Sequence, residues 1–270
     1  MQTLPVNGYD MAYLEIGRGR PLVCVHGTLG DFRTWSAVMG PLSKKHRAIA
    51  VSLRHFFPEH WDGVGNDYLM SQHVADMIGF LERLGDGPVD LMGHSRGGHI
   101  SFRVAQQRPD LLRKLVLAEP GGELDATLDP TAAPDGAAQR AARFAAGAAK
   151  VSDGDVEGAL KQFFETIEGD GAWGRLAAAP KQQLRDNVFT LIGQAGENRK
   201  PYAKAEAQSI KIPTLFIGGT ATKGSLPAVL RALAAHVPGA KTAMIEGAGH
   251  WMFEQAPQEF CAIVTGFLKG

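Results

Sequence analysis

A serine and a histidine occupy the two positions at which this chain is best suited to nucleophilic chemistry. Ser95 stands in the run Gly93-His94-Ser95-Arg96-Gly97, where small residues flank a hydroxyl. His250 stands far downstream, in Gly247-Ala248-Gly249-His250. A hydroxyl is a weak nucleophile near neutral pH, and imidazole is the side chain whose proton affinity suits the task of activating it. The two residues predict a serine nucleophile with a histidine general base.

The Gly-x-Ser-x-Gly pattern around Ser95 indicates a functional serine where a strand runs straight into a helix. An apolar run ending at Met92 precedes it, and a helical pattern over 99–107 follows it. A sharp strand-to-helix turn strains the backbone at the serine and needs small neighbours, which Gly93 and Gly97 supply. An ordinary glycine-rich turn is the alternative, and the flanking elements disfavour it.

Two turns are expected to supply backbone amides for the negative charge that develops on an attacked carbonyl oxygen. The segment Val25-His26-Gly27-Thr28-Leu29 follows an apolar run, as Ser95 does. We expect the amide of Thr28, with Leu29 as its neighbour or substitute, and the amide of Arg96 to form this oxyanion hole. The ring of His26 is expected to brace the loop.

Short apolar runs must form the strands that position these turns. They are Pro21–Val25, Ala48–Val51, Val89–Met92, Lys114–Ala118, Thr214–Ile217 and Thr242–Ile245. One helix is expected from an N-cap at Ser71 to a C-cap at Gly85, and a final helix from Glu254 toward Leu268. Strands alternating with helices predict an α/β fold with a mostly parallel central sheet flanked by helices.

The stretch 124–209 interrupts this alternation, because it contains helical patterns and no strand-like run. The alanine-rich segment 137–150 is helical by propensity, although it also fits a linker. Apolar side chains indicate that the stretch packs on something: Phe144, Phe163, Phe164, Trp173, Val188, Phe189 and Leu191. We therefore predict a helical cap at 124–209, inserted in a core domain formed by 1–123 and 210–270.

The composition limits the classes of protein to which the chain can belong and the classes of partner that it can bind. The 270 residues are 44% hydrophobic, and 28 Lys and Arg balance 28 Asp and Glu. We expect a cytoplasmic globular protein, monomer or homodimer, that binds a small molecule and neither nucleic acid nor membrane. The cysteines, Cys24 and Cys261, fit buried free thiols and form no metal-binding spacing, so no metal or other cofactor is expected.

Three motifs of this chain resemble the landmarks of the α/β-hydrolase superfamily: Val25-His26-Gly27, Gly93-His94-Ser95-Arg96-Gly97-Gly98 and Gly247-Ala248-Gly249-His250. The resemblance spans nearly the whole chain and implies the α/β-hydrolase fold with serine-type chemistry. The landmarks are shared by esterases, lactonases, C–C bond hydrolases, perhydrolases and some receptors without turnover. Haloalkane dehalogenases and the usual epoxide hydrolases use an aspartate nucleophile, which Ser95 disfavours.

The chain departs from the common family pattern at the acid that orients the histidine. The usual position falls in Gly218–Gly224, which contains no carboxylate. In dehalogenases and some lactonases the acid follows the strand after the nucleophile helix, where this chain has Glu119. The resemblance therefore implies Glu119 as the acid, while Glu123, Asp125 or a dyad without an acid remain alternatives. Glu246 is interpreted as structural.

Bulky residues near these motifs predict an apolar substrate pocket, walled by Leu29, Phe56, Phe57 and Trp251. Arg54 and Arg96 are either contacts for an anionic group or surface residues. The expected activity is hydrolysis of a carboxylic ester or lactone of a small, largely apolar substrate through an acyl-enzyme, without a cofactor. Hydrolysis of a C–C or thioester bond, or ligand binding with little turnover, are the alternatives.

Overall fold

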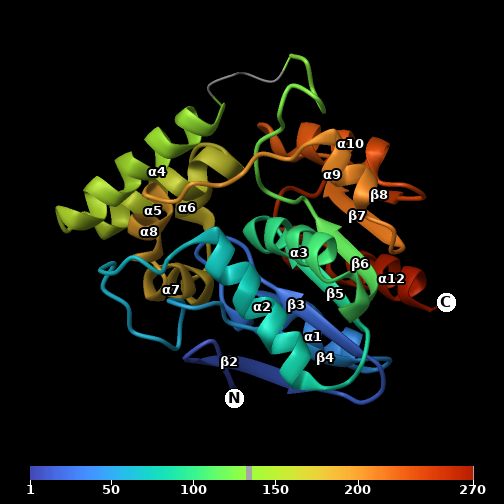
Figure 1. Ribbon diagram of the computed structural model, residues 1–270. Coiled ribbons are helices and arrows are strands. Elements are labelled where there is room, and N and C mark those ends of the chain that lie inside the picture. Colours follow the sequence, from blue (N-terminus) through green and yellow to red (C-terminus); the bar gives the residue numbers. More distant parts are fainter. Residues whose placement is uncertain (132–135, 270) are drawn as a thin grey trace.

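A single sheet of eight strands forms the centre of the computed structural model, which describes residues 1–131 and 136–269 (Figure 1). In spatial order these strands are β1 (Gln2–Val6), β2 (Tyr9–Ile16), β4 (Arg47–Val51), β3 (Pro21–Val25), β5 (Val89–His94), β6 (Leu112–Ala118), β7 (Thr214–Gly219) and β8 (Lys241–Ile245). The six strands from β4 to β8 run parallel. The predicted mostly parallel sheet is confirmed.

The apolar runs do not predict the hairpin of β1 and β2. Its two strands pair antiparallel with each other, and β2 pairs antiparallel with β4 at one edge of the sheet. Asn7 and Gly8, both at positive φ (46° and 79°), make its two-residue turn. An Asn-Gly pair between strands is the sequence signal for such a turn.

Helices cover both faces of the sheet. On one face lie α2 (Met70–Leu84), α3 (Arg96–Gln107) and α10 (Leu226–His236), and on the other lie α1 (Ser36–Ser43), α11 (Met252–Gln255) and α12 (Pro257–Leu268). Gly85 ends α2 in a left-handed conformation, as expected. The predicted N-cap at Ser71 is wrong, because α2 begins at Met70 after an extended Leu69 that makes no capping bond. The final helix is divided in two at Pro257.

A group of helices between β6 and β7 stands over the carboxyl end of the sheet (Figure 1). These are α4 (Gly136–Ser152), α5 (Val156–Glu168), α6 (Ala172–Arg175), α7 (Ala178–Asp186) and α8 (Thr190–Ala195). Phe144, Phe164, Trp173 and Leu191 share an apolar cluster, whereas Phe189 is exposed. Helices α4 to α8 are called the cap below.

The cap helices span less than the predicted 124–209. At the two ends of the insertion, Leu124, Leu128, Tyr202 and Ala207 of α9 (Lys204–Ser209) pack into the core of the sheet domain. Residues 132–135, within the predicted cap, and residue 270, within the predicted core, lie outside the described residues. None of the helices in the described part of the chain has the length and apolar character needed to cross a membrane.

Candidate active site

Ser95 lies on the turn where β5 passes directly into α3. Its backbone has φ 52° and ψ −116°, a strained conformation for a residue with a side chain. A Cβ on Gly93 would overlap the carbonyl of Gly97, and a Cβ on Gly97 would overlap the carbonyl oxygens of Val25 and His26. The two glycines therefore let β3, β5 and α3 approach closely enough to form the turn. Unlike its buried neighbours, Ser95 is partly accessible.

Glu119 and His250 meet beneath the cap. Oε2 of Glu119 lies 2.6 Å from Nδ1 of His250, and both side chains are almost fully buried. The other oxygen, Oε1, accepts a hydrogen bond from the amide of Gly219 at 2.9 Å. Like Ser95, Glu119 has a positive φ (42°). Both carboxylate oxygens are thus held, and the acid fixes which ring nitrogen of His250 faces away.

Burial sets the proton affinity of this pair. It lowers the pKa of His250 to about 3, since a charged imidazolium is poorly solvated there. Burial also raises the pKa of Glu119, against the opposing effect of the Gly219 amide. The ring of His250 is therefore neutral near pH 7, as a proton acceptor must be.

One cavity brings the predicted residues together. Ser95 and His250 line it with Thr28, Leu29 and Trp251, under apolar side chains of the cap: Phe163, Phe164, Ile167, Leu176 and Leu184. Because Nδ1 of His250 faces Glu119, Nε2 is the nitrogen left for the Ser95 hydroxyl. We call this space the apolar cavity.

The expected oxyanion-hole turns both adjoin Ser95. A Cβ on Gly27 would lie 3.0 Å from Cβ of Ser95, so the turn that carries Thr28 passes against Ser95. Arg96 begins α3, where the first amides of a helix have no intrahelical acceptor. Their amides as oxyanion donors remain a prediction.

Two of the four expected pocket residues lie elsewhere. Phe56 is buried against His26, with ring centroids 4.7 Å apart, and belongs to the core cluster under the sheet. Phe57 packs edge-on against Phe32, and its amide donates to Asn187 of the cap. Neither residue lines the apolar cavity. Phe56 and Phe57 do not wall the pocket because aromatic side chains in such a loop pack into a core as readily as into a pocket.

The arginines considered as anion contacts both have protein partners. Arg54 pairs with the buried Asp76 at 2.8 Å. Arg96 forms two hydrogen bonds of 2.6 Å with Glu197, which follows α8. The side chain of the residue after Ser95 is thereby joined to the insertion that carries the cap.

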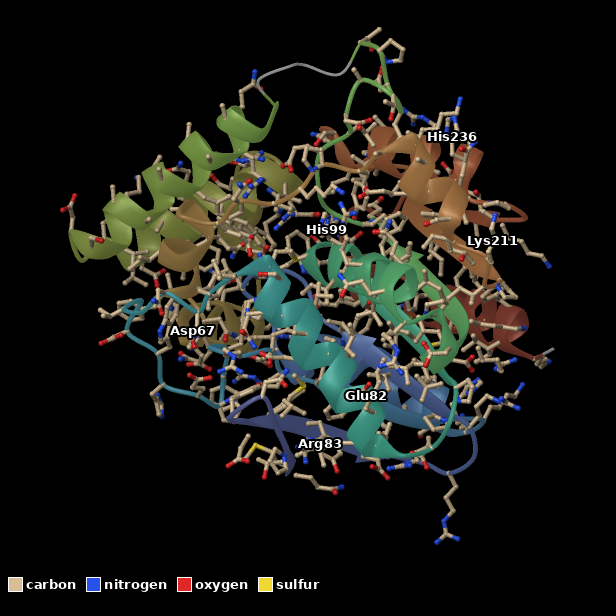
Figure 2. All side chains as sticks on the ribbon, in the orientation of Figure 1. Asp67, Glu82, Arg83, His99, Lys211 and His236 are labelled. Carbon is tan, nitrogen blue, oxygen red and sulfur yellow. The ribbon has the colours of Figure 1, made fainter. Side chains whose placement is uncertain are left out.

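Three other buried histidines make contacts within the framework of the fold. His26 accepts from the amide of Leu53 at 3.1 Å, which braces its loop as expected. Nε2 of His94 lies 3.0 Å from the carbonyl oxygen of His250. His99, near the centre of the molecule in Figure 2, packs its ring against Tyr202. No cluster of metal-ligating side chains occurs within residues 1–131 and 136–269.

A second cavity that also reaches Ser95 has no counterpart among the sequence predictions. Ser95 and His250 line it together with five cationic residues and one acidic residue: Arg96, Arg140, Arg143, Arg199, Lys223 and Glu123. Arg140 and Arg143 stand three positions apart on α4, so they share a helix face. That spacing is a sequence signal, but Arg199 joins them only through the fold.

Residues 22–263 match the Alpha/beta hydrolase family. The sn-1-specific diacylglycerol lipase of Mus musculus is 29% identical over 92% of this chain and 80% of its own length. The soluble epoxide hydrolase of Corynebacterium sp. is 25% identical over 94% of this chain and 91% of its length. Among solved structures, the enol-lactonase of Burkholderia xenovorans LB400 superposes with a TM-score of 0.81 at 19% identity, covering 99% of this chain and 100% of its own.

Proposed function

The chain belongs to the alpha/beta hydrolase family, and we propose that within it the protein is a serine hydrolase of carboxylic esters or lactones. The observation that carries the proposal is the buried contact of Glu119 with His250, at the cavity that Ser95 also lines. An oriented base next to an accessible serine is the arrangement that acyl transfer requires.

The proposed reaction begins when Nε2 of His250 accepts the proton of the Ser95 hydroxyl. Oγ attacks the carbonyl carbon, and the amides of Thr28 and Arg96 stabilise the oxyanion. The C–O bond to the leaving group then breaks, and the leaving oxygen takes the proton from His250. Water repeats the sequence on the acyl-enzyme and restores Ser95. Glu119 holds the ring and stabilises its charged form during each transfer.

The names of the relatives support ester-type substrates. They include a diacylglycerol lipase and an enol-lactonase, and a further structural neighbour is a carboxylesterase of Bacillus subtilis. The epoxide hydrolase relative does not change the proposal, because the nucleophile position of this chain is a serine. The apolar cavity suits an acyl chain or ring of modest size.

Labelling with a fluorophosphonate tests the proposal without knowledge of the substrate. We expect intact-mass analysis to show one adduct on the wild type and none on Ser95→Ala. The matched control is Ser225→Ala, which removes an exposed serine from the lining of the second cavity and should retain the adduct. A folded wild type that stays unlabelled, or a labelled Ser95→Ala, would contradict the proposal.

A further inference from the structure

We infer that the second cavity binds a carboxylate of the substrate, so that the protein acts on esters or lactones that carry an acid group. This inference rests on the proposed function, because it assigns the far end of the substrate that Ser95 attacks. We use the name arginine pocket for Arg140, Arg143, Arg199 and Lys223, which line one cavity with Ser95 and His250.

The carboxylates nearest to the arginine pocket do not balance its buried cations. Arg140, Arg199 and the adjacent Arg96 are each at most 7% exposed at the side chain. Two carboxylates face these three guanidinium groups in the described chain, Glu123 and Glu197. One positive charge is left over, and a buried charge without a partner is costly.

Glu197 directs both of its carboxylate oxygens at Arg96. Both of its oxygens accept 2.6 Å hydrogen bonds from Arg96, in the bidentate geometry that makes such pairs strong. Arg199 reaches the same carboxylate only at 3.5 Å. Nε of Arg199 has no hydrogen-bond partner among residues 1–131 and 136–269.

Arg140 is also incompletely satisfied. Its Nη2 donates to the backbone oxygen of Glu197 at 3.3 Å. Nε lies 2.7 Å from Glu123, but the geometry is not that of a hydrogen bond, and Nε and Nη1 find no such partner within the described residues. Buried polar groups are normally bonded, so donors left over beside a nucleophile indicate a ligand.

The electrostatic environment agrees with this geometry. Burial lowers the pKa of Arg199, and the neighbouring charges of Arg96 and Arg140 lower it further, while Glu197 opposes them. An anion bound between Arg140 and Arg199 would relieve this repulsion. Exposed Arg143 and Lys223 lie at the same cavity and add positive potential toward solvent.

A carboxylate fits these features better than a more highly charged group. The surplus among the buried groups is a single charge, and a planar guanidinium offers paired donors that match the two oxygens of a carboxylate. Phe144 and Phe163 line the same cavity and provide apolar walls for a short linker between the acid and the reacting carbonyl.

Two esters that differ in one terminal group test the inference. p-Nitrophenyl hydrogen adipate carries a free carboxylate, and p-nitrophenyl hexanoate ends in a methyl group. We expect wild-type kcat/KM to favour the adipate ester by about tenfold or more, the usual worth of a charged hydrogen bond. Arg140→Gln should lower that preference about tenfold, mainly through KM, and leave the hexanoate ester nearly unaffected.

Two further variants keep the test decisive. Arg143→Gln removes an exposed charge of the arginine pocket and should weaken the preference even if Arg140→Gln does not fold. Lys150→Gln, on the same helix but paired with Asp155, is the matched control and should retain the preference. Equal or better turnover of the hexanoate ester by the wild type would overturn the inference, as would a preference that survives loss of both arginines.

Failure of the proposed function can be told apart from failure of this inference. Fluorophosphonate labelling without a preference between the esters would refute the anion subsite alone. If the protein neither reacts with the fluorophosphonate nor turns over either ester, calorimetric titration with adipate and with dimethyl adipate shows whether the anion subsite exists without the catalysis. Binding of adipate alone, lost in Arg140→Gln, would support the subsite, and absence of adipate binding would refute it.

Discussion

Glu119 and His250 reach each other across the end of a strand that belongs to neither. Glu119 follows β6, His250 follows β8, and β7 lies between them in the sheet. The 2.6 Å contact is possible because β7 ends in Gly218 and Gly219. A Cβ on Gly218 would lie 3.3 Å from Oε1 of Glu119, so a larger side chain would compete for the space of the carboxylate.

Removing the charge of Glu119 should slow catalysis without unfolding the protein. For Glu119→Gln we expect kcat for an activated ester to fall by roughly 10²–10⁴, since an amide no longer stabilises the imidazolium or selects its tautomer. Stopped-time assays of nitrophenol release measure this. The control is Glu246→Gln, which changes an exposed carboxylate four residues before His250 and should keep full activity. Equal rates for Glu119→Gln and Glu246→Gln would show that Glu119 has no part in the mechanism.

The activity should persist below pH 6.5, the ordinary pKa of a histidine. Burial lowers the pKa of His250 below the ordinary 6.5, and only the neutral ring accepts the Ser95 proton. As the pH falls through 6.5 the base therefore stays neutral, and the acid limb of kcat/KM lies below that value. Initial rates from pH 4 to 8 with a substrate whose own charge is constant check this, and a limb at or above pH 6.5 would contradict it.

The pair of Arg96 and Glu197 should matter for stability. Glu197→Gln leaves the buried Arg96 without its counter-charge and should cost about 3–5 kcal/mol of unfolding free energy, measured by urea denaturation. Glu157→Gln, which breaks an exposed pair with Arg185, is the control and should have little effect.

The same pair predicts how stability depends on pH. Burial would raise the pKa of Glu197, but Arg96 outweighs it and lowers the pKa from 4.5 to about 2. The stabilisation is therefore complete above pH 4.5 and declines as the pH falls toward 2. The difference between wild type and Glu197→Gln should shrink over that interval, and a constant difference would show that ionisation of Glu197 is irrelevant.

Asn187 should control the attachment of the cap to the core. Its side chain accepts from the amide of Phe57 at 2.7 Å and donates to Asp31 at 2.8 Å. In Asn187→Ala the Phe57 amide loses its acceptor, so its hydrogen exchange should accelerate. Gln182→Ala removes an exposed bond to Asp186 and serves as control. Unchanged protection of Phe57 in Asn187→Ala would show that other contacts hold the cap.

Local patterns were sufficient to predict the six parallel strands and the residues on the turns that follow them, although they missed the hairpin of β1 and β2. Ser95 and His250 belong to short motifs, and each motif sits next to an apolar run whose length identifies a strand. The same reasoning failed for Phe56 and Phe57, because an aromatic residue in a loop packs equally well into a core or a pocket. Only the position of the surrounding elements decides between them.

The arginine pocket could not be predicted from the sequence, again because only the fold decides which residues meet. Arg140 comes from α4 and Arg199 from the segment after α8, and nothing near either residue in the sequence indicates the other. The net charge around the two arginines depends on which carboxylates the fold places beside them. The buried side chain of Glu197 was likewise not distinguishable from a surface acid in the sequence.

The position of Glu119 also has a consequence for how this protein can change. Since the proposed acid, Glu119, follows β6, the loop after β7 has no carboxylate to hold in place. Lys223, Gly224 and Ser225 of that loop line the second cavity instead. Random libraries at these positions should therefore yield altered substrate preference with few inactive members, which makes this loop the natural starting point for directed evolution.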